Sequence, residues 1–210
     1  MYEEHQTTAD IKPRFHLSEA LFFMKSSDPR ERGKAEILFE QLVDEKEIEF
    51  HVRVFSLFNL CVLLVTEFQL SGDTKIIDRL NIYLKRLLDI AEEKKLYYLL
   101  IEIYILQSKI ASIKMEIGEA QELLKKAQKL AERNKLDELS TKVFGEQELL
   151  KKQLGSWREL MKKEPPVKER IIAFRLEESI SSIKKQITAN LFEASGDDPS
   201  SLKKLFVLKI

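Results

Sequence analysis

Residues 88–96, LDIAEEKKL, and residues 128–136, QKLAERNKL, carry one pattern twice, forty residues apart. Ala-Glu and Lys-Leu recur at matching places, and each copy closes an amphipathic helix before a new apolar helix begins. A repeat of this length in a helical pattern is typical of stacked helix pairs, in which each pair buries its apolar face against the next. We therefore expect an all-α fold of helical hairpins, a class that mostly binds other molecules and rarely catalyses a reaction.

Apolar residues at three-and-four spacing set the expected helices, and Gly and Pro set their ends. Asp28 before Pro29 predicts an N-cap, and Gly72-Asp73 predicts a left-handed helix end followed by a second cap. Because the links are short, successive helices should be antiparallel neighbours. The pattern predicts helices over about 16–26, 30–46, 48–70, 74–94, 96–115, 117–134 and 136–154, a short helix from Trp157, and a long one over 167–193.

This reading divides the chain into four parts. Residues 1–14 are expected to form a flexible N-terminus, and residues 15–164 a helical-repeat domain. The C-terminal helix, residues 167–193, caps the repeats or forms a coiled coil. Residues 194–210 form a polar turn and an apolar tail that looks like the first strand of something larger, so we expect a signalling domain beyond it.

Composition narrows the class of protein. The 35 basic residues balance 35 acidic ones, so no broad electrostatic footprint for DNA or RNA is expected. The single cysteine, Cys61, fits a reducing compartment, and the N-terminus has no secretory signal, so a cytoplasmic location is expected. The most apolar stretch, Val52 to Leu70, is interrupted by polar residues, which favours a buried helix over a membrane span.

Small residues at helix-pairing positions carry a family resemblance. Ser108 and Ala111 on one helix face Ala120, Leu124 and Ala127 on the next. The same face continues at Leu80, Leu84 and Leu87, and in the earliest pair at Ala35, Phe39 and Leu42. The stretch 16–163 resembles the tetratricopeptide repeat in its long-helix variant. It is similar to the sensor region of maltose-regulator-type transcription activators and to archaeal tetratricopeptide signalling proteins. It departs from the pattern where Met115-Glu116 replaces the usual Gly-Asp and where the terminal Pro is missing.

The resemblance implies a right-handed α-α superhelix of tetratricopeptide-like hairpins, with a long C-terminal helix added. In that family the first helix of each pair lines a concave groove. Tyr97, Tyr98 and Tyr104 fall on such a helix, as do Arg53 and Lys109. Aromatic anchors and charges there would hold a partner peptide, so these five are the candidate partner-binding residues. The alternative is that the aromatic rings fill hairpin interfaces and that the charges are solvated.

No catalytic, cofactor or metal motif is present. Phosphate-loop, dinucleotide, His-Glu-x-x-His, Cys-x-x-Cys and EF-hand spacings are absent. The histidines His5, His16 and His51 are far apart in the sequence, and Cys61 lies in an apolar run where a thiol behaves as a small hydrophobe. We expect no catalytic site, no cofactor and no metal, and therefore a protein that is not an enzyme.

The last helix carries a narrow apolar stripe: Ile172, Leu176, Ile180, Ile183, Ile187 and Leu191. Two arrangements remain open. The helix docks on the repeats as a cap, or residues 167–193 pair with a second copy as a homodimer. The expected function is a non-catalytic interaction or regulatory scaffold that binds a protein or peptide partner in its groove. The alternative is a small-molecule-sensing input domain of a signalling or transcription regulator.

Overall fold

The computed structural model describes residues 8–160 and 165–195, and all regular structure in these ranges is helical. Chain contacts divide the protein into two compact units, residues 1–63 with 187–210, and residues 64–186. Two helices, α3 (Phe50–Ser71) and α9 (Leu176–Ser195), pass from one unit to the other.

In the first unit, α1 (Thr8–Met24) packs against α2 (Pro29–Asp44). The core of this pair contains Leu17, Ala20, Ala35, Phe39 and Leu42, each at most 1% exposed. The Asp28 Oδ1 atom accepts a hydrogen bond from the Arg30 N–H at 2.9 Å, so the predicted N-cap is confirmed.

Helix α1 begins eight residues before its expected start, and Pro13 lies inside it. Proline removes one intrahelical hydrogen bond, but near the beginning of a helix few bonds precede it. The ring is also buried, which offsets part of that loss. The remaining residues of the expected flexible N-terminus, 1–7, lie outside the described ranges.

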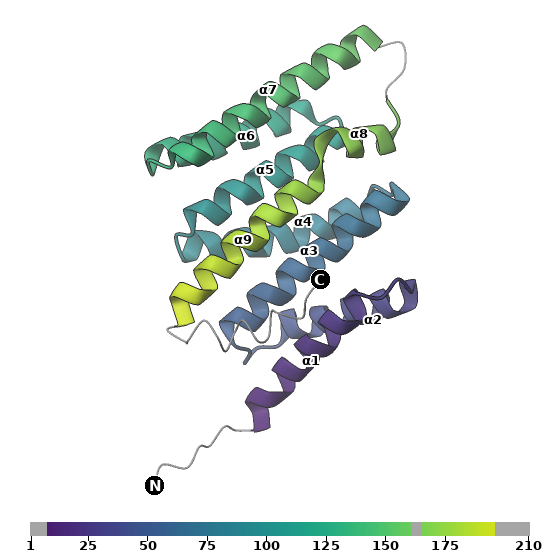
Figure 1. The fold of residues 1–210 in the computed structure, drawn as a ribbon, viewed down its shortest axis with the longest axis vertical. Coiled ribbons are helices and arrows are strands. Elements are labelled where there is room, and N and C mark those ends of the chain that lie inside the picture. Colours follow the sequence, from purple (N-terminus) through teal and green to yellow (C-terminus); the bar gives the residue numbers. More distant parts are fainter. Residues whose placement is uncertain (1–7, 161–164, 196–210) are drawn as a thin grey trace. The chain divides into compact units, whose positions relative to one another are not determined.

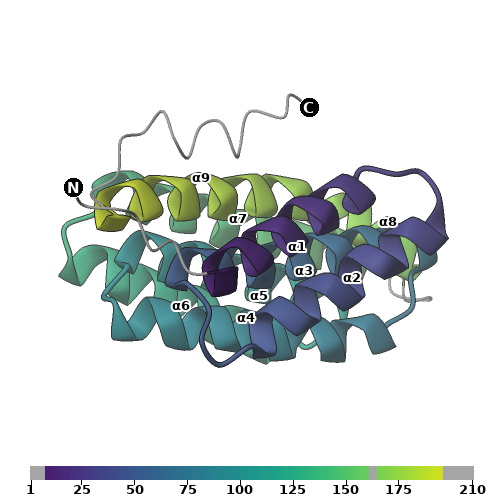
Figure 2. The same cartoon turned by 90° about the horizontal axis from the view of Figure 1, so that it is seen from below.

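The second unit is an orderly series of α4 (Lys75–Glu93), α5 (Tyr97–Ile113), α6 (Ile117–Arg133) and α7 (Asp137–Leu160), followed by α8 (Val167–Phe174) and the start of α9. Within this unit the helices form three layers, with α4 and α6 in the first, the end of α3, α5 and α7 in the second, and α8 with α9 in the third (Figures 1 and 2). Among the described helices, α5 and α6 share the most extensive contact. The predicted pairing residues of these two helices are all buried, with exposures of 0–4% for Ser108, Ala111, Ala120, Leu124 and Ala127.

The repeated phrase of the sequence is a helix-stop signal. Lys95, Met115 and Lys135 stand twenty residues apart, and each adopts a left-handed conformation with φ of 55°, 65° and 56°. The residue after each one donates its N–H to the carbonyl of an alanine five positions back, at 2.8–2.9 Å. This bond pattern closes a helix and turns the chain. Met115 therefore performs the turn where the resembled family has glycine.

Two helix boundaries near the C-terminus differ from the predicted ones. Helix α7 continues through Gly155 to Leu160, so the expected stop at Gly155 is wrong. A Cβ added at Gly155 would meet nothing within 4 Å, and a glycine without a left-handed backbone only weakens a helix. The expected final helix is instead two helices, α8 and α9, because Arg175 adopts φ 46° between them.

One described helix, α3, is long and apolar enough to cross a membrane. In its most apolar 18-residue window, 67% of the residues are buried inside the protein. The core helix of a soluble protein has this property, and α3 is consistent with that role.

Candidate interaction face

A buried cluster of four charges joins α5 to α7 in the second unit. The Lys142 Nζ atom lies 2.7 and 2.8 Å from the two carboxylate oxygens of Glu102. The Lys109 Nζ atom lies 2.9 Å from Glu146 Oε1. The side chains of Glu102 and Lys109 are only 3% and 4% exposed, so both charges have left water and found a partner. We call the surface of α5 and α7 that carries these four residues the inner face.

Burial changes the chemistry of Glu102. Loss of solvent around its carboxyl raises the pKa, while the hydrogen bond and the positive charge of Lys142, and the charge of Lys109, act in the opposite direction. The nearby Glu146 carboxylate also raises the pKa. The four groups therefore act as one electrostatic unit, with two positive and two negative members.

The C-terminal helices contact α3, α5 and α7. Helix α8 packs on α5, and a Cβ placed on Gly72, at the end of α3, would lie 3.9 Å from Val167 at the start of α8. Gln69 of α3 donates a hydrogen bond to Glu177 of α9. The Lys142 Nζ atom donates to Ser182 Oγ at 2.9 Å, which ties α9 to the charge cluster on α7.

Only part of the apolar stripe predicted for the last helix is buried in the structure. Leu176, Ser179 and Ile183 are 0–1% exposed, whereas Ile172 is 76% exposed on α8. The break at Arg175 explains this, because a left-handed residue rotates α8 relative to α9 and removes Ile172 from the stripe. Leu176 and Ile183 are buried within a single chain, so the structure contains the docked arrangement of α9. The side chain of Leu191 lies outside the described residues.

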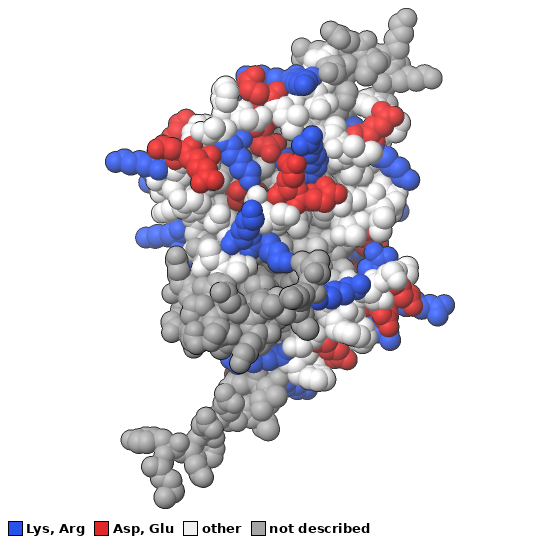
Figure 3. Space-filling model, viewed as in Figure 1, with Lys and Arg blue, Asp and Glu red and all other residues white. Residues whose placement is uncertain are grey.

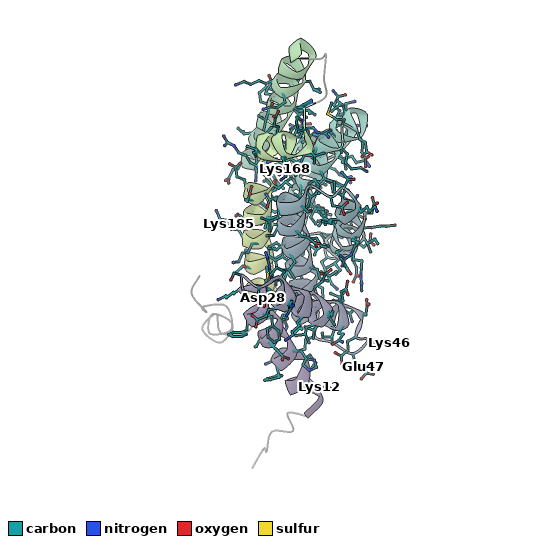
Figure 4. All side chains as sticks on the ribbon, turned by 90° about the vertical axis from the view of Figure 1, so that its right-hand side faces the viewer. Lys12, Asp28, Lys46, Glu47, Lys168 and Lys185 are labelled. Atoms are coloured by element: carbon teal, nitrogen blue, oxygen red, sulfur yellow. The ribbon has the colours of Figure 1, made fainter. Side chains whose placement is uncertain are left out.

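The outer side of α9 is charged and solvated. Lys184 and Lys185 are exposed, and Lys185 points away from the layer of α3 and α5 in Figure 4. On the visible face of residues 64–186 in Figure 3, basic and acidic side chains alternate, and neither sign forms a continuous patch. The surface around α9 is therefore mixed in charge.

Within the second unit, the structure does not bring the four predicted partner-binding residues of α5 onto one surface. Lys109 is held by Glu146 and is nearly inaccessible. The Tyr104 hydroxyl points to Glu92 of α4 at 3.4 Å, and burial together with this carboxylate raises its pKa. Tyr97 is half-buried, seven residues before Tyr104 and so on the same side of α5.

Among the predicted residues of α5, Tyr98 is both exposed to solvent and aligned with the inner face. It is 45% exposed and stands four residues before Glu102, at the end of the inner-face stripe of α5. Arg53 belongs to the first unit, where its Nη2 atom donates to the carbonyls of Glu45 and Lys46 at 2.8 and 3.2 Å. It thus closes the end of α2 and has a structural role.

Lys142 and Glu146, which complete the face, and Ser182 of α9, which contacts it, were not among the predicted site residues. One signal for them exists in the sequence. Glu102 and Lys142 differ by the forty-residue repeat and carry opposite charges. Equivalent positions of neighbouring first helices lie side by side, so opposite charges there predict an ion pair.

The cysteine and histidine side chains named in the sequence analysis show no sign of a reactive or metal-binding site among the described residues. Cys61 is buried, and desolvation raises the pKa of its thiol far above the ordinary value, which leaves it a protonated hydrophobe. His51 Nε2 lies 2.9 Å from Glu49, whose carboxylate also accepts two bonds from Arg14. Across residues 8–160 and 165–195, His, Cys, Asp and Glu form no group of three that could hold a metal ion.

A pocket of about 310 Å³ lies between α6 and α7. Its floor contains Leu124 and Leu150, and its rim contains Gln121, Lys125, Gln147 and Lys151. Lys151 stands forty residues after Ala111, which is a predicted helix-pairing residue of α5. Lys151 is exposed where Ala111 is buried, so the series of small pairing residues does not continue at this position of α7.

Comparison of the chain with protein-family models, curated proteins and solved structures gives no match.

Proposed function

We propose that this protein is a non-catalytic interaction module of the tetratricopeptide type, whose inner face binds a helix of a partner protein. One observation carries the proposal: the inner face already holds an amphipathic helix, α9. Leu176 and Ile183 of that helix are buried, and the helix makes polar contacts to Gln69 of α3 and to Lys142 of α7. A groove that receives one apolar helix face and fixes it by a few polar contacts is a general mode of peptide recognition.

The forty-residue period supports the repeat assignment. Three successive helices end at the same left-handed turn, and their pairing residues follow the small-and-bulky pattern of tetratricopeptide hairpins. A right-handed superhelix would follow from continued stacking of such pairs. We propose this arrangement, a cytoplasmic location and a scaffold or regulatory role together, because a rigid series of hairpins serves to position other proteins.

Site-specific photo-cross-linking in the host cell tests the function. A cross-linking residue replaces Tyr98 or Lys142 on the inner face, and Lys126 on the exposed side of α6 is the matched control position. We expect one discrete protein adduct from positions 98 and 142 that is absent from position 126. Equal adducts at all three positions, or none at 98 and 142 in a folded protein, would contradict the proposal.

The pocket between α6 and α7 favours a second candidate function, small-molecule sensing. Its volume of about 310 Å³, apolar floor and amide-bearing rim are those of a site for a small ligand. A thermal-shift screen of metabolites tests this function, because a ligand that binds the folded state raises the melting temperature. The replacement Gln147→Ala should abolish the shift, and a shift that survives it would place the ligand elsewhere.

A further inference from the structure

The charge cluster of the inner face is complete without α9. Both ion pairs, Glu102 with Lys142 and Lys109 with Glu146, join α5 to α7 and involve no residue of the C-terminal helices. If α9 left, each charge would keep its partner and would gain water. A permanently buried interface is usually apolar, because charges there lose hydration and gain little. Paired charges under a helix are instead suited to a surface that is exposed for part of the time.

The contact between α9 and the inner face is itself imperfect. The Ser179 hydroxyl is buried and has no hydrogen-bond partner among residues 8–160 and 165–195. A buried hydroxyl without a partner favours the exposed state of the segment that carries it. Arg175, which joins α8 to α9, holds a left-handed backbone conformation that a residue with a side chain rarely adopts. Both features weaken the docked state of α9 without affecting the packing of α5 on α6.

The polar contacts of α9 define what else would fit. Glu177 faces Gln69, and Ser182 faces Lys142. The apolar Leu176 and Ile183 lie seven residues apart and flank these two polar residues in the sequence. Positions seven apart share one side of a helix. The face thus selects an amphipathic helix with this apolar spacing, an acid one residue after the first apolar position, and a hydroxyl one residue before the second.

We infer that α8 and α9 are a displaceable occupant of the inner face, and that a partner protein's amphipathic helix of the same pattern replaces them. This inference rests on the proposed function and adds its regulation. The protein would hold its own helix until a partner helix competes for the face. Apparent affinity for the partner would then be lowered by the fraction of molecules whose face is occupied in cis.

Binding of a labelled peptide tests the inference directly. The probe is a fluorescein-labelled peptide of residues 167–195, and its anisotropy is measured with full-length protein. The variant Ile183→Asp places a charge in the buried stripe and so empties the face in cis, while Ile183→Ala weakens docking more gently. The matched control is Ile172→Asp, which changes the same residue type at a position that is 76% exposed.

We expect Ile183→Asp to bind the peptide at least about tenfold more tightly than the wild type, because the cis occupant no longer competes. Ile183→Ala should lie between them, and Ile172→Asp should match the wild type. A peptide that itself carries Ile183→Asp should not bind. If both Ile183 variants retain the helical circular dichroism of the wild type and neither binds the peptide better, the inference is overturned, as it is if both lose their fold.

The result separates the two proposals. Peptide binding by Ile183→Asp without any inner-face adduct in cells would support a displaceable helix and contradict a partner-binding function. An inner-face adduct without peptide binding would support the partner-binding function and overturn the displaceable helix, because the partner would then bind beside an α9 that stays in place.

Discussion

Glu102 of α5 and Lys142 of α7 occupy equivalent positions of successive repeats and form a buried ion pair, with both carboxylate oxygens within 2.8 Å of the ammonium nitrogen. The Glu102 side chain is nearly inaccessible to solvent, whereas the Lys142 side chain is 33% exposed. The repeat that builds the hairpins therefore also places opposite charges side by side. The same lysine binds Ser182, so the pair links hairpin stacking to the position of α9.

Removal of the lysine should leave a buried carboxylate without its main partner. We expect Lys142→Met to lower the free energy of unfolding by about 2 kcal/mol, less than for a fully buried pair because Lys142 is partly solvated. The double variant Glu102→Met with Lys142→Met should be close to the wild type, since no unpaired charge remains. Urea unfolding of the four proteins of this cycle measures both effects. Additive losses would show that the two residues do not interact.

The raised pKa of Glu102 predicts an unusual pH dependence. The folded state holds this proton more tightly than the unfolded state, so between the ordinary value of 4.5 and the raised value the folded protein binds more protons. Glu102 therefore contributes stability below the ordinary pKa that is lost as the pH rises through the folded pKa. Relative to Glu102→Gln, the wild type should lose stability over this window. Parallel curves of unfolding free energy against pH would contradict the shift.

The left-handed helix ends offer a stabilising change. Lys95, Met115 and Lys135 hold positive φ values, which cost about 1–2 kcal/mol for residues with a side chain. Glycine removes this cost but loses more entropy on folding, so each replacement by Gly should raise the free energy of unfolding by about 0.5–1 kcal/mol. Replacement of the same residues by Ala gives the control and should bring no gain. Thermal unfolding of the six variants would refute the assignment if Ala and Gly acted alike.

The interface between α5 and α6 should not tolerate a larger residue. Ala127 and Ala120 are fully buried on α6. We expect Ala127→Leu to destabilise the protein by at least about 1–3 kcal/mol, because added methyl groups force neighbouring side chains out of their preferred rotamers. The exposed Lys126→Leu is the matched control and should change stability little. A neutral Ala127→Leu would show that the two helices pack loosely.

Much of the architecture was predictable because it rests on local patterns. The apolar spacing of α2 to α6 and the caps at Asp28 and Gly72 depend on residues close in sequence, and these predictions are confirmed. Two boundaries near the C-terminus were wrong because local signals were ambiguous. Gly155 resembled a stop although its backbone is helical, and Arg175 carries no signal for a left-handed turn.

The site was less predictable because it depends on long-range packing. Lys109 and Glu146 are separated by most of two helices, and no local pattern reports that they meet. The apolar spacing of α9 predicts that one side is buried, and both docking on the repeats and pairing with a second copy satisfy it. The position of α8 and α9 beside the inner face depends on the path of the chain after α7. No local sequence pattern predicts that path.

A zero-length cross-link tests most directly whether α9 docks on its own chain, beside the end of α3. In the variant Gln69→Lys, the new ammonium group would stand beside Glu177, the residue that now accepts a hydrogen bond from Gln69. Carbodiimide treatment should then join positions 69 and 177 by an amide within a monomer, detected by mass spectrometry. The native pair of Lys125 and Glu122, at 2.6 Å, is the internal control. Cross-linking of the control pair without any link between 69 and 177 would contradict the account.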